Sequence, residues 1–228
     1  GAALDDKTPL LRSQEAINET GVRLLRALGD KDVTRVVSNV GWEQEFFLVD
    51  KDLYLARPDL QNCGRTLVGN LPPRHQQTDL NYYGVVPPRV KAFLTDLQTE
   101  VWRLGISLST MHNEVAPGQH EVSPIFSLTN VATDQNQILM EVMHDVSISH
   151  GLIALFHEKP FAGVNGSGKH NNWGLNTDTG ANLFVPGKTP QTQQRFMAFV
   201  SALAHALCQH GDLVRCGVAT AANDHRLG

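Results

Sequence analysis

The sequence predicts an α+β fold in which helices pack on a largely antiparallel sheet. One observation supports the fold class, and a second supports a globular chain. Segments of helical periodicity alternate with pairs of strand-like segments, and apolar residues make up 41% of the chain against 18% charged residues. Such a composition is typical of a globular protein and argues against disorder. A chain of 228 residues is also long enough to bury a sizeable core.

Four segments are predicted helices because their apolar residues recur every three or four positions. The clearest is residues 88–104, where the apolar residues form one stripe. The first candidate, residues 8–29, starts with a capping threonine and a proline and ends with a glycine. A third helix is expected to begin at residue 133 or 134, and the last to span residues 190–210.

Five segments are predicted strands because β-branched and other apolar residues dominate them. They are residues 33–40, 43–49, 106–115, 120–128 and 152–156. Gly41 is expected to end the first of these strands, and the second begins after it. Residues 57–87 are rich in proline, and we predict a long ordered loop there, of a length that is typical of functional loops.

Charge and cysteine content exclude several classes of protein. The net charge of −4 argues against nucleic-acid binding through bulk positive charge, and no apolar run is long enough to cross a membrane. Asp5 and Asp6 stand where a secretory signal would carry basic and apolar residues. Cys63, Cys208 and Cys216 form no CxxC motif, so we expect a reduced, cytoplasmic protein.

Two glutamates lie in the predicted strand that follows Gly41. Glu43 and Glu45 are two residues apart, so their side chains leave the same face of the strand. The apolar run after them suggests a strand covered on both faces, where two carboxylates would repel each other and lose hydration. The alternative is that the strand begins in solvent and that both glutamates face water.

A second pair of glutamates flanks Pro117 and Gly118. With these two as the central turn residues of a hairpin, Glu114 would lie directly across from Glu121. Such a like-charged pair is destabilising unless a cation neutralises it, although both side chains could also sit on an exposed edge. Four glutamates in two pairs suggest a site for a hard divalent cation such as Mg²⁺ or Mn²⁺.

A glycine-rich segment from Gly163 to His170 matches the first seven positions of a phosphate-binding P-loop. The eighth position, which should be serine or threonine, is His170, and the residues that follow are poor helix formers, so a P-loop is not expected. Asn165 can donate and accept hydrogen bonds and thereby orient a small polar substrate. His170 is a possible metal ligand, or a loop residue bonded to backbone.

Four motifs together resemble the glutamine synthetase family. They are GWEQEFFL, NEVAPGQHEV, EKPFAGVNGSGKHNNW and NDHRLG, and GRTL in the long loop is similar to the type III branch. The resemblance implies a glutamine synthetase/guanido kinase-like catalytic domain that occupies residues 1–228 in part. It implies that an amino-terminal β domain and a carboxy-terminal part are absent, and that the 228 residues alone are inactive.

The resemblance also implies roles for single residues. The implied metal ligands, for two Mg²⁺ or Mn²⁺ ions per site, are Glu43, Glu45, Glu114, Glu121 and His170. Glutamate binding is implied for Asn165, Gly166 and Arg226, with Arg226 also catalytic, and ATP binding for Gly41 and Phe126. His112 and His120 flank the hairpin glutamates and could contact substrate or hydrogen-bond the ligands.

The activity implied by the resemblance is ATP-dependent ligation of ammonia to glutamate through a γ-glutamyl phosphate. The partners are glutamate, ammonia, ATP and further copies of the chain, expected as stacked hexameric rings. One position departs from many family members, because Asn172 stands where they have a second histidine. Two alternatives stay open: a related ligase that uses another amine, and a structural relative without catalysis.

Overall fold

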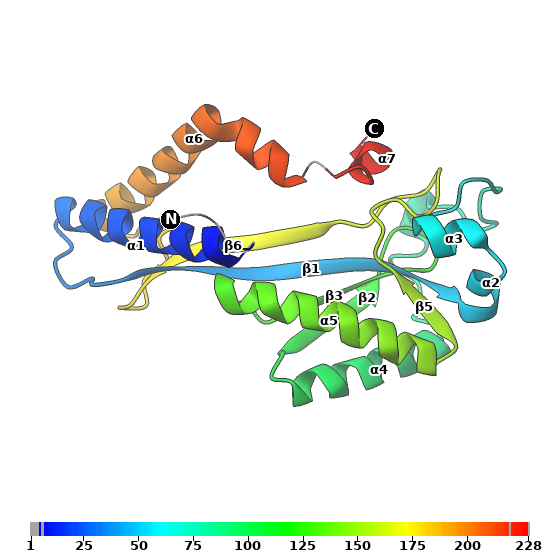
Figure 1. Cartoon of the computed structure of the whole chain (residues 1–228). Helices are drawn as coiled ribbons and strands as arrows, with labels where there is room; N and C mark the ends of the chain where they lie inside the picture. Colours follow the sequence, from blue (N-terminus) through cyan, green and yellow to red (C-terminus); the bar gives the residue numbers. More distant parts are fainter. Residues whose placement is uncertain (1–4, 6, 219, 228) are drawn as a thin grey trace. The chain divides into compact units, whose positions relative to one another are not determined.

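The computed structural model describes Asp5, residues 7–218 and residues 220–227 (Figure 1). Asp6, one of the two acidic residues considered above, lies outside them. The chain divides into two compact units. Unit 1 comprises residues 1–40, 126–133 and 172–218, and unit 2 comprises residues 41–125, 134–171 and 219–228.

The described residues form seven α-helices and one short 3-10 helix. They are α1 (Lys7–Ala27), α2 (Lys51–Leu55), α3 (Pro58–Cys63), η1 (Gln77–Asp79), α4 (Pro88–Arg103), α5 (Thr129–Ser149), α6 (Pro190–Val218) and α7 (Asn223–Leu227). The four predicted helices are present as α1, α4, α5 and α6. α5 begins earlier than predicted, at Thr129, and α6 continues past His210, where the backbone departs from helical angles (φ −127°, ψ 24°).

One six-stranded sheet runs through the described residues. Its strands are β1 (Val36–Asp50), β2 (Leu108–Asn113), β3 (Gln119–Pro124), β4 (Ser127–Leu128), β5 (Leu152–Leu155) and β6 (Lys169–Thr177). The long strand β1 pairs antiparallel with β3, β4 and β5, and it also pairs with β6. β2 pairs antiparallel with β3. The predicted α+β fold with a largely antiparallel sheet is therefore confirmed.

Gly41 does not interrupt the strand, so the prediction of two separate strands is wrong. β1 continues through Gly41 for 15 residues. Ladder pairs continue on both sides of it, with Val40 opposite Ser127 and Gln44 opposite Val122. A glycine inside a strand costs about 1 kcal/mol of backbone entropy, and the pairing on either side offsets that cost.

The segment from residue 57 to 87 is not simply a loop. It contains α3, which begins with proline at its first position and ends at Gly64 in the left-handed region (φ 68°). This is the usual arrangement of proline at the start and glycine at the end of a helix. Residues 64–87, which contain η1, form the rest of the segment and are called the long loop below.

Each unit has its own apolar cluster. In unit 1 the cluster comprises Val22, Leu25, Val33, Val36, Leu175, Leu183 and Phe199. In unit 2 one cluster comprises Phe47, Leu60, Ala116, Ile153, Leu155 and Val164. Figure 1 shows α4 and α5 together on one side of the sheet, where Phe93 of α4 packs edge-on against Phe46 of β1 (6.3 Å between ring centroids). Among the described helices, none has the length and apolar character that a membrane crossing needs.

Candidate metal centre

Two glutamates of β1 lie on the face of the strand opposite Phe46. Successive residues of a strand alternate between faces, and Gln44 and Phe46 lie on the same side as the packed helices. Gln44 accepts a hydrogen bond there from Asn136 Nδ2 at 3.2 Å. Glu43 and Glu45 therefore share the other face, as predicted. Glu45 is buried, with 8% of its surface exposed, and Glu43 is half-buried.

β3 brings a third glutamate opposite Glu45. Glu45 and Glu121 are direct partners in the antiparallel pair of β1 and β3, and both are only 8% exposed. Partners at this position have Cβ atoms about 5 Å apart. The like-charged cross-strand pair in the structure is therefore Glu45 with Glu121, which the sequence did not predict.

The predicted pairing of Glu114 with Glu121 is wrong. Pro117 and Gly118 do occupy the centre of a turn, closed by a 3.1 Å hydrogen bond from Gln119 N to Ala116 O, with Gly118 at φ 73°. The ladder, however, resumes two residues out of the predicted register, since His112 is the partner of Glu121. A shift of two residues keeps side chains on the same face, so Glu114 still projects beside Glu121.

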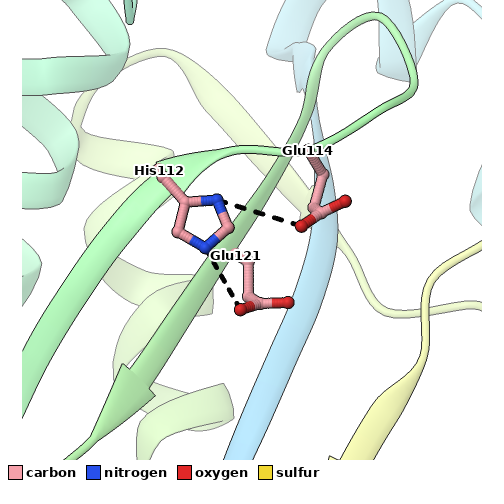
Figure 2. Close-up of side chains that lie close together, drawn as sticks. All are labelled: His112, Glu114 and Glu121. Carbon is pink, nitrogen blue, oxygen red and sulfur yellow. Dashed lines mark hydrogen bonds and ion pairs between the residues drawn. The ribbon is translucent and has the colours of Figure 1, made fainter. Parts of the chain in front are cut away.

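His112 joins these two glutamates, as Figure 2 shows. Its Nε2 lies 3.2 Å from Glu121 Oε1, and its Nδ1 lies 3.9 Å from Glu114 Oε1. One ligand atom from each of the three residues lies within 4.8 Å of the others. The ring of Tyr82 also stands edge-on to the imidazole, 5.5 Å away. The structure thus places one imidazole and two carboxylates at a spacing that a single cation could bridge.

Burial and mutual repulsion raise the affinity of these carboxylates for protons. Burial is the main reason that the pKa of Glu121 rises to about 7, and the charges of Glu43, Glu114 and Glu45 raise it further. His112 acts in the opposite direction. Burial also raises the pKa of Glu114, with Glu45 and Glu43 contributing in the same direction. All four predicted glutamates therefore belong to one electrostatic cluster.

His170 lies beside Glu43. It lies at the start of β6, and its Nδ1 is 3.0 Å from Glu43 Oε2, with 58% of its side chain exposed. β6 begins at Lys169, directly after Gly168, where a P-loop would require a helix. The structure thus agrees with rejecting the P-loop, and it brings His170 to Glu43.

The glycine-rich segment from Gly163 to Gly168, called the glycine loop below, is bonded to Glu45. Gly168 N donates to Glu45 Oε2 at 2.5 Å, and Glu45 N donates to Gly168 O at 3.3 Å. A Cβ at Gly166 would collide with the carbonyl oxygen of Glu158. The close backbone approach therefore requires glycine at position 166.

Gln119 and Arg226 also contact the glycine loop. The buried carboxamide of Gln119 donates to Gly166 O at 3.0 Å and to Ser167 Oγ at 3.1 Å. It also accepts from Ala116 N at 3.2 Å, so it ties the loop to the turn beyond Glu114. Arg226 of α7 lies over the loop, with its Cγ 3.0 Å from the position that a Cβ at Gly166 would take.

The other three predicted site residues are Asn165, Gly41 and Phe126. Asn165 is exposed on the glycine loop and is bonded to Gln76 of the long loop. Gly41 is half-buried in β1, two residues before Glu43 and on the same face. Phe126 follows β3, is 64% exposed, and belongs to unit 1, whereas Gly41 belongs to unit 2.

The donor set fits hard divalent cations. Carboxylate oxygens with one or two imidazoles are ligands that Mg²⁺ and Mn²⁺ accept. Burial, together with the charges of the neighbouring carboxylates, raises the pKa of Glu121 to about 7, and a bound cation would offset the negative charge gathered there.

The model of a protein family described as "Glutamine synthetase, catalytic domain" matches residues 22–210 of this chain. The chain belongs to the glutamine synthetase family. It is 52% identical over its whole length to a type-3 glutamine synthetase of Dictyostelium discoideum and 50% identical to a glutamine synthetase of Bacteroides fragilis (strain YCH46). The chain covers 31% of the length of each of these two relatives.

A solved structure described as ligand-free GmaS also overlaps this chain. The TM-score is 0.49 at 26% sequence identity, and the overlap covers 75% of this chain and 36% of the other.

The sequence indicated one of the two further residues that contact this site and gave no sign of the other. His112 is predicted to contact substrate or to hydrogen-bond the ligands, and in the structure its Nε2 lies 3.2 Å from Glu121 Oε1. Its separation from Glu114 by two positions on a strand was the signal that both share a face. Gln119 was not considered, and nothing in the local pattern indicates that its side chain reaches the glycine loop.

Proposed function

We propose that this chain is part of the catalytic domain of a longer glutamine synthetase. The proposed reaction joins ammonia to the γ-carboxylate of glutamate and converts ATP to ADP and phosphate. The observation that carries the proposal is the convergence of four carboxylates and two imidazoles on one face of the sheet, in a member of this family. A structural relative without catalysis would have no reason to keep these repelling carboxylates together.

The proposal assigns the metal ligands to two groups. Glu45, Glu114 and Glu121 would hold one Mg²⁺ or Mn²⁺, and Glu43 with His170 would hold a second. When bound, such ions neutralise phosphate charge and align the reactants. The contact of Gly168 N with Glu45 fixes one carboxylate oxygen on the side of the glycine loop. The same contact links substrate binding on this loop to the geometry of the cluster.

The remaining assignments concern the substrates. Asn165, Gly166 and Arg226 would bind glutamate, with Arg226 supplying a positive charge next to the loop. Gly41 and Phe126 would contact ATP. In the proposed reaction the γ-carboxylate attacks the γ-phosphate of ATP, and ammonia then displaces phosphate from the γ-glutamyl phosphate. We further propose a cytoplasmic homo-oligomer, arranged as stacked hexameric rings.

The test is an assay of the longer protein with MgATP, glutamate and ammonia. We expect glutamine and phosphate in equal amounts, and at least a hundredfold slower turnover for Glu121→Gln, because the charge that holds the ion is lost. Parallel reactions with methylamine separate a related ligase from a glutamine synthetase. Faster product formation with methylamine than with ammonia, or no product with either, would refute the proposed reaction.

A further inference from the structure

The backbone of Asn165 determines how the side chain of Gln76 is oriented. Asn165 N donates to Gln76 Oε1 at 2.7 Å. Because a backbone N–H can only donate, the oxygen of the Gln76 carboxamide must face it, and the nitrogen must lie on the other side. That nitrogen, Nε2, donates to Asn165 Oδ1 at 3.0 Å. One glutamine thus holds both the main chain and the side chain of Asn165.

This pair links two segments that are 89 residues apart in the sequence. Gln76 directly precedes η1 in the long loop and is half-buried, whereas Asn165 is exposed on the glycine loop. The oxygen of the Asn165 carboxamide is engaged by Gln76. The Asn165 side-chain nitrogen, Nδ2, carries two N–H groups. Within the described part of the chain it donates to no other residue. Asn165 therefore offers hydrogen-bond donors from its nitrogen to a ligand.

We propose that Gln76 is a positioning residue that holds the Asn165 carboxamide so that its NH₂ group meets a carboxylate of the substrate. This inference rests on the proposed function, in which Asn165 binds glutamate. A carboxylate accepts hydrogen bonds from N–H groups and is repelled by an amide oxygen. The rotation of one side chain therefore decides between attraction and repulsion, and Gln76 sets that rotation from a loop outside the metal cluster.

The decisive variant is Gln76→Glu, which has nearly the same shape. A carboxylate at position 76 still accepts from Asn165 N, but it has no donor for Asn165 Oδ1. The Asn165 carboxamide is then expected to turn, so that its nitrogen faces the new carboxylate and its oxygen faces the substrate. We expect the KM for glutamate to rise about tenfold, the size of one hydrogen bond to a charged group, while kcat stays within twofold.

Two further variants separate positioning from a general structural role. Gln76→Ala leaves the Asn165 carboxamide free to rotate, so it should raise the KM for glutamate less than Gln76→Glu does. A structural role predicts the reverse order, since truncation disturbs packing more than an isosteric change. The control is Gln77→Glu, which introduces the same charge at the next residue, where the side chain is exposed. This variant should leave the KM for glutamate unchanged.

A spectroscopic measurement makes the outcome independent of turnover. The side-chain NH₂ resonances of Asn165, assigned through Asn165→Asp, should move in Gln76→Glu and not in Gln77→Glu. If the parent protein makes no glutamine, the proposed function fails and the NMR result alone decides the positioning role. An unmoved Asn165 NH₂ signal, an unchanged KM in Gln76→Glu, or equal losses of kcat and Mn²⁺ affinity would each overturn the inference.

Discussion

Glu45 of β1 and Glu121 of β3 face each other as direct cross-strand partners, and both are buried. Two carboxylates in this position destabilise a sheet unless a positive charge lies between them. His112 supplies part of that charge only when it is protonated, and its Nε2 lies 3.2 Å from Glu121. The pair therefore stores repulsion that a divalent cation would relieve, and four predictions follow from the site around it.

Replacing Glu121 by glutamine should stabilise the ion-free chain and weaken its response to metal. The substitution removes one of four mutually repelling carboxylates and one proposed ligand. We expect thermal unfolding in the presence of a chelator to shift upward. The further shift caused by MnCl₂ should shrink, because an ion that binds the folded state stabilises it by RT ln(1 + c/Kd), where c is the ion concentration, and this quantity falls as the affinity falls.

The matched control for this prediction is Glu141→Gln. Glu141 is an exposed residue of α5, outside the acidic cluster, and it undergoes the same change of charge. Its variant should keep the full response to MnCl₂. Equal stabilisation of both variants by Mn²⁺ would show that the acidic cluster does not bind the ion.

Divalent affinity should increase as the pH rises through about 7. Burial and the neighbouring glutamates raise the pKa of Glu121 from 4.5 to about 7 in the ion-free protein, so below that pH a proton competes with the ion. The folded state holds this proton more tightly than the unfolded chain does. The contribution of Glu121 to the stability of the ion-free protein therefore falls as the pH rises from about 4.5 to 7.

Calorimetry can check this pH dependence directly. Titration of Mn²⁺ at pH 6, 7 and 8, in buffers of different ionisation enthalpy, should show proton release at pH 6 that disappears by pH 8. An affinity that stays constant across this range, with no proton released, would be incompatible with a raised Glu121 pKa.

Replacing His112 by alanine should weaken Mn²⁺ binding and move its pH midpoint upward. His112 lowers the pKa of Glu121, so its loss raises that pKa further. As a ligand, or as a hydrogen-bond partner of two ligands, it should contribute about tenfold to metal affinity. His144→Ala, on an exposed position of α5, is the control. An unmoved pH midpoint in His112→Ala would exclude this electrostatic role.

Replacing Gly166 by alanine should destabilise the protein. A Cβ there would collide with the carbonyl oxygen of Glu158 and come within 3.0 Å of Arg226 Cγ, so the glycine loop must shift. Forcing extra volume into such a contact costs about 1–3 kcal/mol, which urea denaturation can measure. Gly69→Ala, where nothing lies within 4 Å, should change the free energy of unfolding by much less. Similar losses in both variants would argue against the collision.

Local patterns in the sequence were sufficient for most of the fold and for the shared face of two glutamates. The 3.6-residue periodicity predicted α1, α4, α5 and α6 because an amphipathic helix must repeat its apolar face. The two-residue spacing of Glu43 and Glu45 fixed their shared face in the same way. The sequence patterns did not reveal β6, whose polar residues Asn171 and Asn172 do not look like a strand.

Which carboxylates meet, and through which neighbours, was decided by tertiary structure. The register of β3 on β1 placed Glu121 opposite Glu45, and an extended hairpin loop replaced the predicted partner Glu114 by His112. The contact between Gln76 and Asn165 is likewise invisible in the sequence. Side-chain periodicity is a property of single segments, whereas register and loop closure depend on long-range pairing and on the fit of turns, which no single segment encodes.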